Sequence, residues 1–393
     1  MHKLSDIDKT PKIKIHGKPN FNNALIFIAV ILLGVFIAVF SQLVNTIRKE
    51  NLVTSSSSSI TSAENTSSSS SNTASTNNTS RVSGLFMISI SGTEYSENMK
   101  KYIEDINPGG IILMGSNISS KEQVTKLIKD IRSNVKNGDR ILFATDQEGG
   151  TVSRLKWDPS SSVNSVDIGK KSETEQRKIY ANHAKTLKDV GININFAPVS
   201  DLGVPNSFIL KRSFGSNSAK VSKSVSYFLD EHNKLVVGAT LKHFPGLGKS
   251  ISDPHKVLPS VDISKADLLT QDIVPFKNNF SKTNFVMTSH VVYPKIDKDN
   301  PTTFSKILVT DILRSELGYD KVVITDDLNM DAVKKDENKY VKALISGHDM
   351  LLTLDSKENI LKAISNITKS IDNKELDITK SLERLDLQRE LLL

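Results

Sequence analysis

The sequence predicts an α/β fold, a single (β/α)8 TIM-like barrel over residues 81–393, preceded by one membrane-spanning helix and a disordered linker. Eight short apolar runs recur along residues 81–393, amphipathic helical patterns separate them, and most of the runs end in charged or imidazole side chains. Apolar strands that alternate with helices form parallel sheets covered on both faces. Eight of them favour a closed barrel, with an open doubly wound sheet as the alternative.

The first 44 residues contain the predicted membrane anchor. Residues 24–44 are uncharged, and about 21 helical residues span a ~30 Å hydrocarbon core. A cleaved signal peptide is the alternative, although the apolar part is longer than a typical signal core. Five lysines precede this segment, whereas only Arg48 and Lys49 follow it closely. The tail, residues 1–23, is therefore expected in the cytoplasm and the rest outside, as in a single-pass cell-membrane protein.

The linker is predicted over residues 45–80. Residues 54–80 are nearly all Ser, Thr and Asn, with too few apolar side chains to offset the entropy of ordering the backbone. The globular domain is therefore expected to begin near Arg81.

Composition excludes several classes of protein. The chain has no cysteine, which excludes disulfides, thiolate metal sites and a lipid anchor on cysteine. Its net charge of +7 comes from scattered lysines without interleaved aromatic residues, so nucleic acid is not an expected partner. Attraction to an anionic cell wall fits this charge better. We expect a monomer without a cofactor.

The eight apolar runs are the candidate barrel strands. They begin at Leu85, Gly110, Ile141, Ile194, Gly238, Phe285, Val322 and Met350. Between the second and third runs, apolar residues from Val124 to Val135 repeat every three or four positions, which predicts a helix. Ser120 and Gln123 are spaced as its capping box, and residues 137–139 (Asn-Gly-Asp) predict a turn after it.

Polar side chains follow five of these strands. One such residue could simply cap a strand end. Five sets at the same end of successive strands instead predict a site, because active sites of barrel enzymes lie at the C-terminal ends of the strands. The residues are Asp146, Lys242 with His243, His290, Asp326 with Asp327, and Asp355.

Three segments carry the candidate chemistry. In ATDQEGGTVSRL, residues 144–155, Asp146 and Arg154 could face a polar substrate, although the paired glycines also suit a tight turn. In residues 241–259, a Pro/Gly/Ser-rich loop places Asp253 two residues before His255. The carboxylate could orient the imidazole and raise its pKa, as a proton donor requires, and a solvated loop histidine is the alternative.

The third segment, VVITDDLNM at residues 322–330, delivers two adjacent carboxylates at a strand end. Successive strand residues point to opposite faces, so only one of Asp326 and Asp327 is expected to face the barrel axis, and the other to cap the following helix. A carboxylate opposite a proton donor is typical of double-displacement glycoside hydrolysis, although most such enzymes use a carboxylic acid as the donor.

In this order and spacing, the three segments resemble family 3 glycoside hydrolases of the bacterial β-N-acetylglucosaminidase type. The resemblance extends over residues 81–393 and includes the segments that start at Asn193 (NINFAPVSDL), Arg212 (RSFGS), Ser289 (SHVVYPKIDKDNPTTFS) and Ser346 (SGHDMLL). It implies a (β/α)8-like barrel, retention of anomeric configuration and no metal.

The resemblance also implies roles for single residues. Asp326 matches the nucleophile that forms a covalent glycosyl-enzyme, His255 the acid/base, and Asp253 its dyad partner. The positions that hold the N-acetylglucosamine ring match Asp146, Arg154, Arg212, Lys242 and His243.

Two residues depart from the family pattern. Leu247 stands where the family usually has a histidine in its KHFPGHG motif, and Pro254 replaces the usual serine between Asp253 and His255. Pro254 restricts the backbone of Asp253 and removes one hydrogen-bond donor, so we expect an effect on dyad geometry or loop mobility, and hence on rate.

The resulting expectation is an anchored exo-β-N-acetylglucosaminidase that acts on peptidoglycan fragments or related cell-surface glycans. A β-glucosidase, a β-xylosidase or a phosphorylase of the same fold are alternatives. Phosphorolysis stays open because a neutral imidazole donor adds no negative charge that would repel an incoming anion. A non-catalytic wall-binding protein is the alternative from another class.

Overall fold

The structure, a computed structural model, describes residues 78–393. The predicted cytoplasmic tail, membrane span and nearly all of the predicted linker lie outside these residues. Within residues 78–393, no helix combines the length and apolar character needed to cross a membrane.

Eight parallel strands form the centre of the fold. They are β1 (Phe86–Ser89), β2 (Gly110–Ile112), β3 (Leu142–Thr145), β6 (Ile194–Asn195), β7 (Gly238–Phe244), β8 (Phe285–Thr288), β11 (Val322–Thr325) and β12 (Leu351–Thr353). Their spatial order is β11-β8-β7-β6-β3-β2-β1-β12. All eight predicted strands are confirmed, each within or beside its apolar run.

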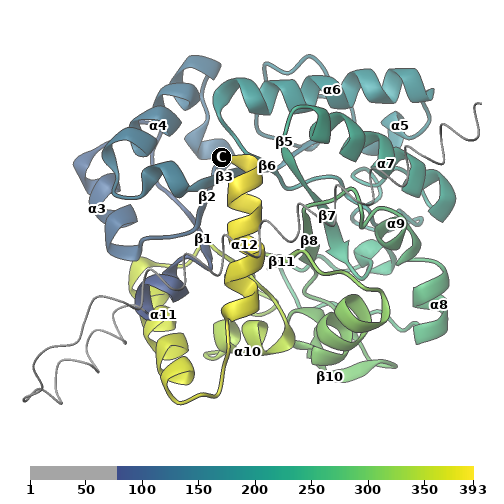
Figure 1. Ribbon diagram of the computed structural model, residues 1–393. Helices are drawn as coiled ribbons and strands as arrows, with labels where there is room; N and C mark the ends of the chain where they lie inside the picture. The colour runs from purple at the N-terminus through teal and green to yellow at the C-terminus, as the bar shows by residue number, and fades with distance from the viewer. Residues whose placement is uncertain (1–77) are drawn as a thin grey trace, which may run out of the picture. The chain divides into compact units, whose positions relative to one another are not determined.

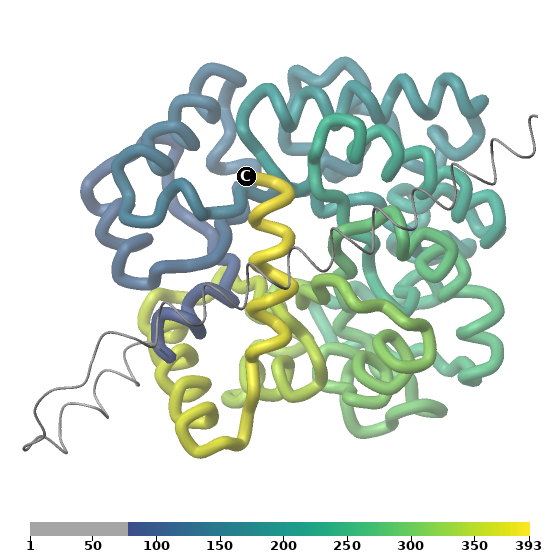
Figure 2. Tube along the Cα trace, viewed as in Figure 1, coloured from purple at the N-terminus to yellow at the C-terminus, as the bar shows by residue number. Residues whose placement is uncertain are grey.

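The sheet closes nearly completely into a barrel. β1 pairs with β12 from Phe86↔Leu351 onward. Ile324 and Met350 form a single parallel bridge between β11 and β12, and the backbone N–H of Thr325 donates to the Met350 carbonyl at 3.1 Å. Figure 2 shows the chain passing round the barrel in one direction, so that its first and last β/α units are neighbours. The predicted α/β barrel is confirmed at this level.

Helices surround the strands (Figure 1). They are α3 (Glu97–Ile106), α4 (Lys121–Asn134), α5 (Ser165–Ile168), α6 (Glu173–Val190), α7 (Ser218–Lys234), α8 (Lys265–Thr270), α9 (Val274–Lys277), a π-helix at Ile307–Glu316, α10 (Lys339–Ser346), α11 (Lys357–Asp372) and α12 (Thr379–Leu392). Short antiparallel ribbons pair β4 (Gln147–Gly149) with β5 (Val152–Ser153), and β9 (Val292–Tyr293) with β10 (Asp297–Pro301).

The helix predicted after β2 is α4. Its buried face contains Val124, Leu127, Ile128 and Ile131. Ser120 caps it by accepting the Gln123 N–H at 3.1 Å. The predicted capping box is only half formed, because the Gln123 side chain accepts the N–H of Ser119, at 2.8 Å, in place of that of Ser120.

The C-terminal helix α12 packs against the N-terminal ends of the strands. The Leu392 carbonyl accepts from Asn193, just before β6, and Gln388 accepts from Asn284, just before β8, at 3.1 and 2.8 Å. α12 thus covers the N-terminal end of the barrel, and the polar side chains that follow the strands lie at the opposite, C-terminal end.

Candidate active site

Most of the predicted site residues line one pocket at the C-terminal ends of the strands. Seven of the eight candidate residues line it, namely Asp146, Arg154, Arg212, Lys242, His243, His255 and Asp326. Asp327 also lines the pocket beside Asp326, and apolar side chains complete its wall, namely Ile112, Met114, Val152, Phe196, Met287, Met330, Leu352 and Leu354. Charged groups and an apolar wall together suit a ligand such as a sugar ring, which has polar hydroxyls and apolar C–H faces.

Asp326 follows β11 directly. Its backbone N–H donates to the Thr288 carbonyl of β8 at 3.3 Å, and its Oδ1 accepts the N–H of Asp327 at 2.8 Å. Burial by itself would raise the pKa of the Asp326 carboxyl. The nearby His243 and His290, the Asp327 N–H and Lys242 outweigh burial, so that the pKa lies below its usual value. Asp326 is therefore ionised at neutral pH.

Asp327 has a different environment. Its Oδ1 accepts the backbone N–H groups of Asn329 and Leu354, both at 2.9 Å, which ties the loop after β11 to the end of β12. Burial, with a contribution from Asp326, raises the pKa of Asp327 to about 6 against the effect of these two hydrogen bonds. The expectation that Asp327 caps a helix is wrong, since turns follow it and α10 begins only at Lys339.

The predicted dyad forms in the loop after β7. His255 Nδ1 lies 2.8 Å from Asp253 Oδ1, and the same oxygen accepts the His255 backbone N–H at 3.0 Å. Burial opposes ionisation of Asp253, but these hydrogen bonds and the charge of His255 hold the pKa of its carboxyl below the usual value. The His255 side chain is 64% exposed, so its outer ring nitrogen is accessible to a ligand. Asp253 itself does not line the pocket.

Glu148 holds two of the pocket cations in place. Arg212 makes a bidentate ion pair with it, at 2.8 and 2.7 Å, and Lys242 Nζ contacts it at 2.7 Å. Lys242 also contacts Asp146 at 2.7 Å. Burial opposes the charge on Glu148, yet Arg212 and Lys242 lower the pKa of its carboxyl to about 2. Glu148 therefore stays charged and fixes the directions of both cations.

Asp201 orients His243 in the same way. Its Oδ2 accepts the backbone N–H and Nδ1 of His243, at 3.1 and 2.8 Å, and its Oδ1 accepts the Leu247 N–H at 2.7 Å. Because Nδ1 donates to Asp201, Nε2 of His243 is the nitrogen left for the pocket, 3.5 Å from Arg212. A Cβ on Gly248 would clash with the Leu202 carbonyl oxygen, so glycine permits this close approach of the two loops.

Lys242 and His243 both line the pocket although they are adjacent in a strand. A regular strand would point only one of them inward. The pairing of β7 with β8 changes register between Leu241 and Phe244, and an irregularity of this kind re-aims side chains.

Glu148 and Asp201 were not among the site residues predicted from the sequence, and they are buried at 3% and 0% exposure. A signal for Glu148 was available, since it lies two residues after Asp146 and so on the same face of an extended chain. Asp201 lies within the NINFAPVSDL segment, but only its contact with His243 reveals its role.

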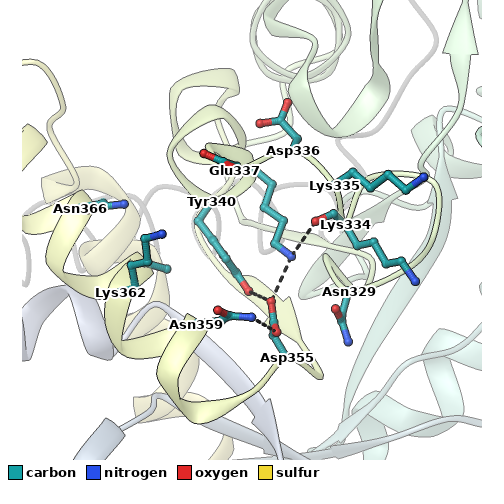
Figure 3. A pocket seen from close by; sticks show the side chains of 12 residues that line it. Asn329, Lys334, Lys335, Asp336, Glu337, Tyr340, Asp355, Asn359, Lys362 and Asn366 are labelled. Atoms are coloured by element: carbon teal, nitrogen blue, oxygen red, sulfur yellow. Dashed lines mark hydrogen bonds and ion pairs between the residues drawn. The ribbon is translucent and has the colours of Figure 1, made fainter.

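The two other strand-end residues serve neighbouring structure. His290 is buried beside Asp326, and its Nε2 lies 2.9 Å from the Asp327 carbonyl oxygen. Asp355 turns into a separate pocket (Figure 3), where Lys339, Tyr340 and Asn359 bond its two oxygens at 2.7–3.2 Å. With both oxygens engaged, Asp355 organises the end of β12. In the described part of the chain, no cluster of three or more His, Asp or Glu side chains is suited to a metal ion.

Comparison with known proteins identifies the family of this barrel. Residues 79–387 match the family model described as the glycosyl hydrolase family 3 N terminal domain. The chain belongs to this family. It is therefore a glycoside hydrolase, and the predicted family resemblance is confirmed.

Curated and structurally known relatives agree with this assignment. A beta-hexosaminidase from Idiomarina loihiensis is 33% identical over 287 residues, which cover 71% of this chain and 86% of the relative. The glycoside hydrolase family 3 beta-N-acetylglucosaminidase from Paenibacillus sp. has a TM-score of 0.74 at 28% identity, covering 80% of this chain and 62% of that one. The beta-N-acetylglucosaminidase from Thermotoga maritima has a TM-score of 0.70 at 27% identity, covering 79% and 67%.

Leu247 and Pro254, the two departures from the usual family 3 motifs, have clear structural settings. The Leu247 side chain is 1% exposed and belongs to a buried apolar cluster, while its backbone N–H bonds Asp201. Pro254 is buried between Asp253 and His255, and the dyad forms across it.

Proposed function

We propose that this glycoside hydrolase is a retaining exo-β-N-acetylglucosaminidase. The observation that carries the proposal is that an ionised carboxylate, Asp326, and the imidazole of the Asp253–His255 dyad border the same pocket as the charged groups suited to sugar hydroxyls. A carboxylate facing a proton donor is the arrangement needed for double displacement at an anomeric carbon.

In the first step, an Asp326 oxygen attacks the anomeric carbon and the bond to the glycosidic oxygen breaks. The imidazolium of His255 donates its proton to that oxygen, so the aglycone leaves as a neutral alcohol. In the second step, His255 accepts a proton from water, and the resulting nucleophile displaces Asp326 from the sugar. Two inversions return the original anomeric configuration. Asp253 acts through His255 by holding its ring in place.

The proposed substrate is a glycan with a terminal β-linked N-acetylglucosamine, such as a peptidoglycan fragment. The names of the two structurally known relatives, both beta-N-acetylglucosaminidases, support the N-acetyl sugar. The pocket volume of about 230 Å³ lies below the ~300–1,000 Å³ of pockets for drug-sized ligands, which fits one terminal sugar residue better than an internal segment. The predicted anchor at residues 24–44 would hold the enzyme at the outer face of the membrane, near such glycans.

Hydrolysis of chromogenic β-N-acetylglucosaminide, β-glucoside and β-xyloside tests the activity and the sugar. We expect clear preference for the N-acetyl sugar and loss of turnover in Asp326→Ala. Asp331→Ala, an exposed carboxylate on the same loop, is the matched control and should keep its activity. Equal, slow turnover by wild type and Asp326→Ala would refute the proposal, and sugar binding without turnover would indicate a wall-binding protein.

A 5-fluoro derivative of N-acetylglucosamine with a good leaving group tests retention, because it slows release of the covalent intermediate. Peptide mapping should find the sugar on Asp326, and a label on another residue would contradict the mechanism. Repeating the assay with inorganic phosphate distinguishes phosphorolysis, since a phosphorylase would release N-acetylglucosamine 1-phosphate.

Extraction of cell membranes at alkaline pH tests the location. The full chain should stay in the membrane pellet, and externally added protease should remove residues 81–393 from intact spheroplasts. Release into the alkaline supernatant would contradict the anchor without affecting the enzymatic proposal.

A further inference from the structure

Arg154 is the pocket cation with the weakest side-chain attachment. Lys242 and Arg212 contact carboxylates at 2.7–2.8 Å, whereas the ion pair of Arg154 with Asp146 measures 3.7 Å. The buried Nε of Arg154 has no hydrogen-bond partner among residues 78–393. Since side-chain contacts hold Arg154 so loosely, the position of its guanidinium depends on its backbone.

The side chain of Gln147 fixes that backbone. Its Oε1 accepts the N–H of Arg154 at 2.9 Å and that of Leu155 at 3.0 Å, and its Nε2 lies 3.4 Å from the Leu155 carbonyl oxygen. Gln147 is 0% exposed, so bulk water does not compete for these bonds. It lies between Asp146 and Glu148, and alternation along an extended segment turns it away from the pocket, toward the loop that follows.

Buried polar groups anchor Gln147 to the body of the barrel. Its Nε2 lies 3.4 Å from Oδ2 of Asp158, and the same carboxylate oxygen lies 3.4 Å from Nε2 of His183 in α6. Its backbone exchanges two hydrogen bonds with the side chain of Asn195 at the end of β6, at 3.0 and 3.1 Å. Gln147 thus connects the loop that carries Arg154 to β6 through its backbone and, by way of Asp158, to α6 through its side-chain amide.

We infer that Gln147 is a positioning residue for sugar binding, which acts by holding Arg154 at the pocket. The inference rests on the proposed function for the identity of the sugar. Because Arg154 would contact the sugar ring both before and during the reaction, displacing it weakens substrate and transition state alike. The signature of such a loss is a higher KM with little change in kcat.

Gln147→Leu tests the inference, because it keeps much of the volume and removes the acceptor for two buried N–H groups. We expect KM for the chromogenic β-N-acetylglucosaminide to rise about tenfold, with kcat within about twofold of wild type. Gln388→Leu is the matched control, since it removes a buried amide that bonds Asn284 at the other end of the barrel. It should leave KM unchanged even if it lowers the melting temperature.

Exchanging the amide of Gln147 and the carboxylate of Asp158 provides a second test, which does not require Gln147→Leu to fold. Gln147→Glu alone places two carboxylates together, and Asp158→Asn alone removes the charged acceptor for the Gln147 amide. In the double variant, the carboxylate introduced at position 147 can still accept the N–H of Arg154, and the amide introduced at position 158 can donate to that carboxylate. KM should be raised in both single variants and return to within about threefold of wild type in the double variant.

An unchanged KM in Gln147→Leu, or a KM that does not recover in the double variant, would overturn the inference about Gln147. Turnover by the wild type would still support the proposed function. If the wild type does not turn over, calorimetry with N-acetylglucosamine gives the same comparison. A tenfold weaker Kd in Gln147→Leu would support the role of Gln147 even though hydrolysis had failed, and an unchanged Kd would refute it. Failure of the wild type to bind the sugar would refute both proposals.

Discussion

Oδ1 of Asp253 accepts both the ring Nδ1 and the backbone N–H of His255, at 2.8 and 3.0 Å. One carboxylate oxygen thus holds both the ring and the backbone of His255, while the side chain of His255 remains 64% exposed. A dyad with this geometry can hold a proton for a leaving group without burying the proton donor.

His255→Ala should affect substrates according to their leaving groups. With a glycan or alkyl aglycone, which needs protonation, we expect kcat/KM to fall by about 10²–10⁴-fold. With a dinitrophenyl leaving group, which departs as the anion, the first step should be nearly unaffected. Rates for a series of aryl β-N-acetylglucosaminides measure this dependence, and Asp253→Asn should give an intermediate slope. Equal losses with every leaving group would contradict the assignment of His255 as the acid.

Pro254→Ser tests whether proline pre-organises the dyad. Proline sets the φ angle of the turn that joins Asp253 to His255, so the variant has more loop conformations to lose. We expect kcat to fall about two- to fivefold, the equivalent of ~0.4–1 kcal/mol. Pro294→Ser is the control, because Pro294 occupies the same place in a turn closed by the N–H of Ile296 and the Tyr293 carbonyl, at 2.8 Å. A similar fall in both variants would indicate a general effect of loop stability.

Glu148→Gln should weaken both sugar binding and stability. The folded-state pKa of Glu148, about 2, lies below the usual 4.5, so its ionisation stabilises the fold above pH 4.5, and this contribution is lost as pH falls toward 2. The difference corresponds to roughly 3 kcal/mol, at ~1.4 kcal/mol per pKa unit. Urea unfolding at pH 7 should therefore show a loss of about this size, together with a raised KM. Glu173 forms an exposed surface ion pair with Arg177, so Glu173→Gln is the control and should change neither the free energy of unfolding nor KM appreciably.

Asp327→Asn should stabilise the protein at neutral pH. The folded-state pKa of Asp327, about 6, lies above the usual 3.8, so its favourable contribution is present below pH 3.8 and is lost as pH rises through 6. Asparagine keeps an oxygen for the N–H groups of Asn329 and Leu354 without the charge. The gain over wild type should grow from pH 4 to pH 7, to at most roughly 3 kcal/mol.

The pH series for Asp327→Asn needs a carboxylate with the opposite shift as its control. The ion pair with Lys334 lowers the pKa of the exposed Asp331. Asp331→Asn should therefore give no gain in the free energy of unfolding as pH rises. A flat difference between wild type and Asp327→Asn from pH 4 to pH 7 would contradict the raised pKa.

Much of the barrel could be predicted because its signals are local. Most strands are short apolar runs, and α4 repeats apolar residues on one face, so neighbouring residues suffice to define these elements. The dyad could also be predicted, because Asp253 and His255 are two residues apart in the sequence. The ends of helices were predicted less well, as the half-formed capping box at Ser120 and the absence of a helix directly after Asp327 show. A few hydrogen bonds decide where a helix begins or ends.

The eight strands, their order along the chain and the candidates Asp326 and His255 were determined by the sequence alone. Only the tertiary structure decided that Glu148 would bind Lys242 and Arg212, that Asp201 would orient His243, and that Gln147 would hold Arg154. Glu148 is 64 residues from Arg212 in the chain. The physical reason is that ion pairs and buried hydrogen bonds depend on distance in space. Closure of the barrel brings together side chains that are far apart in the chain, and the local sequence around one of them does not indicate its partner.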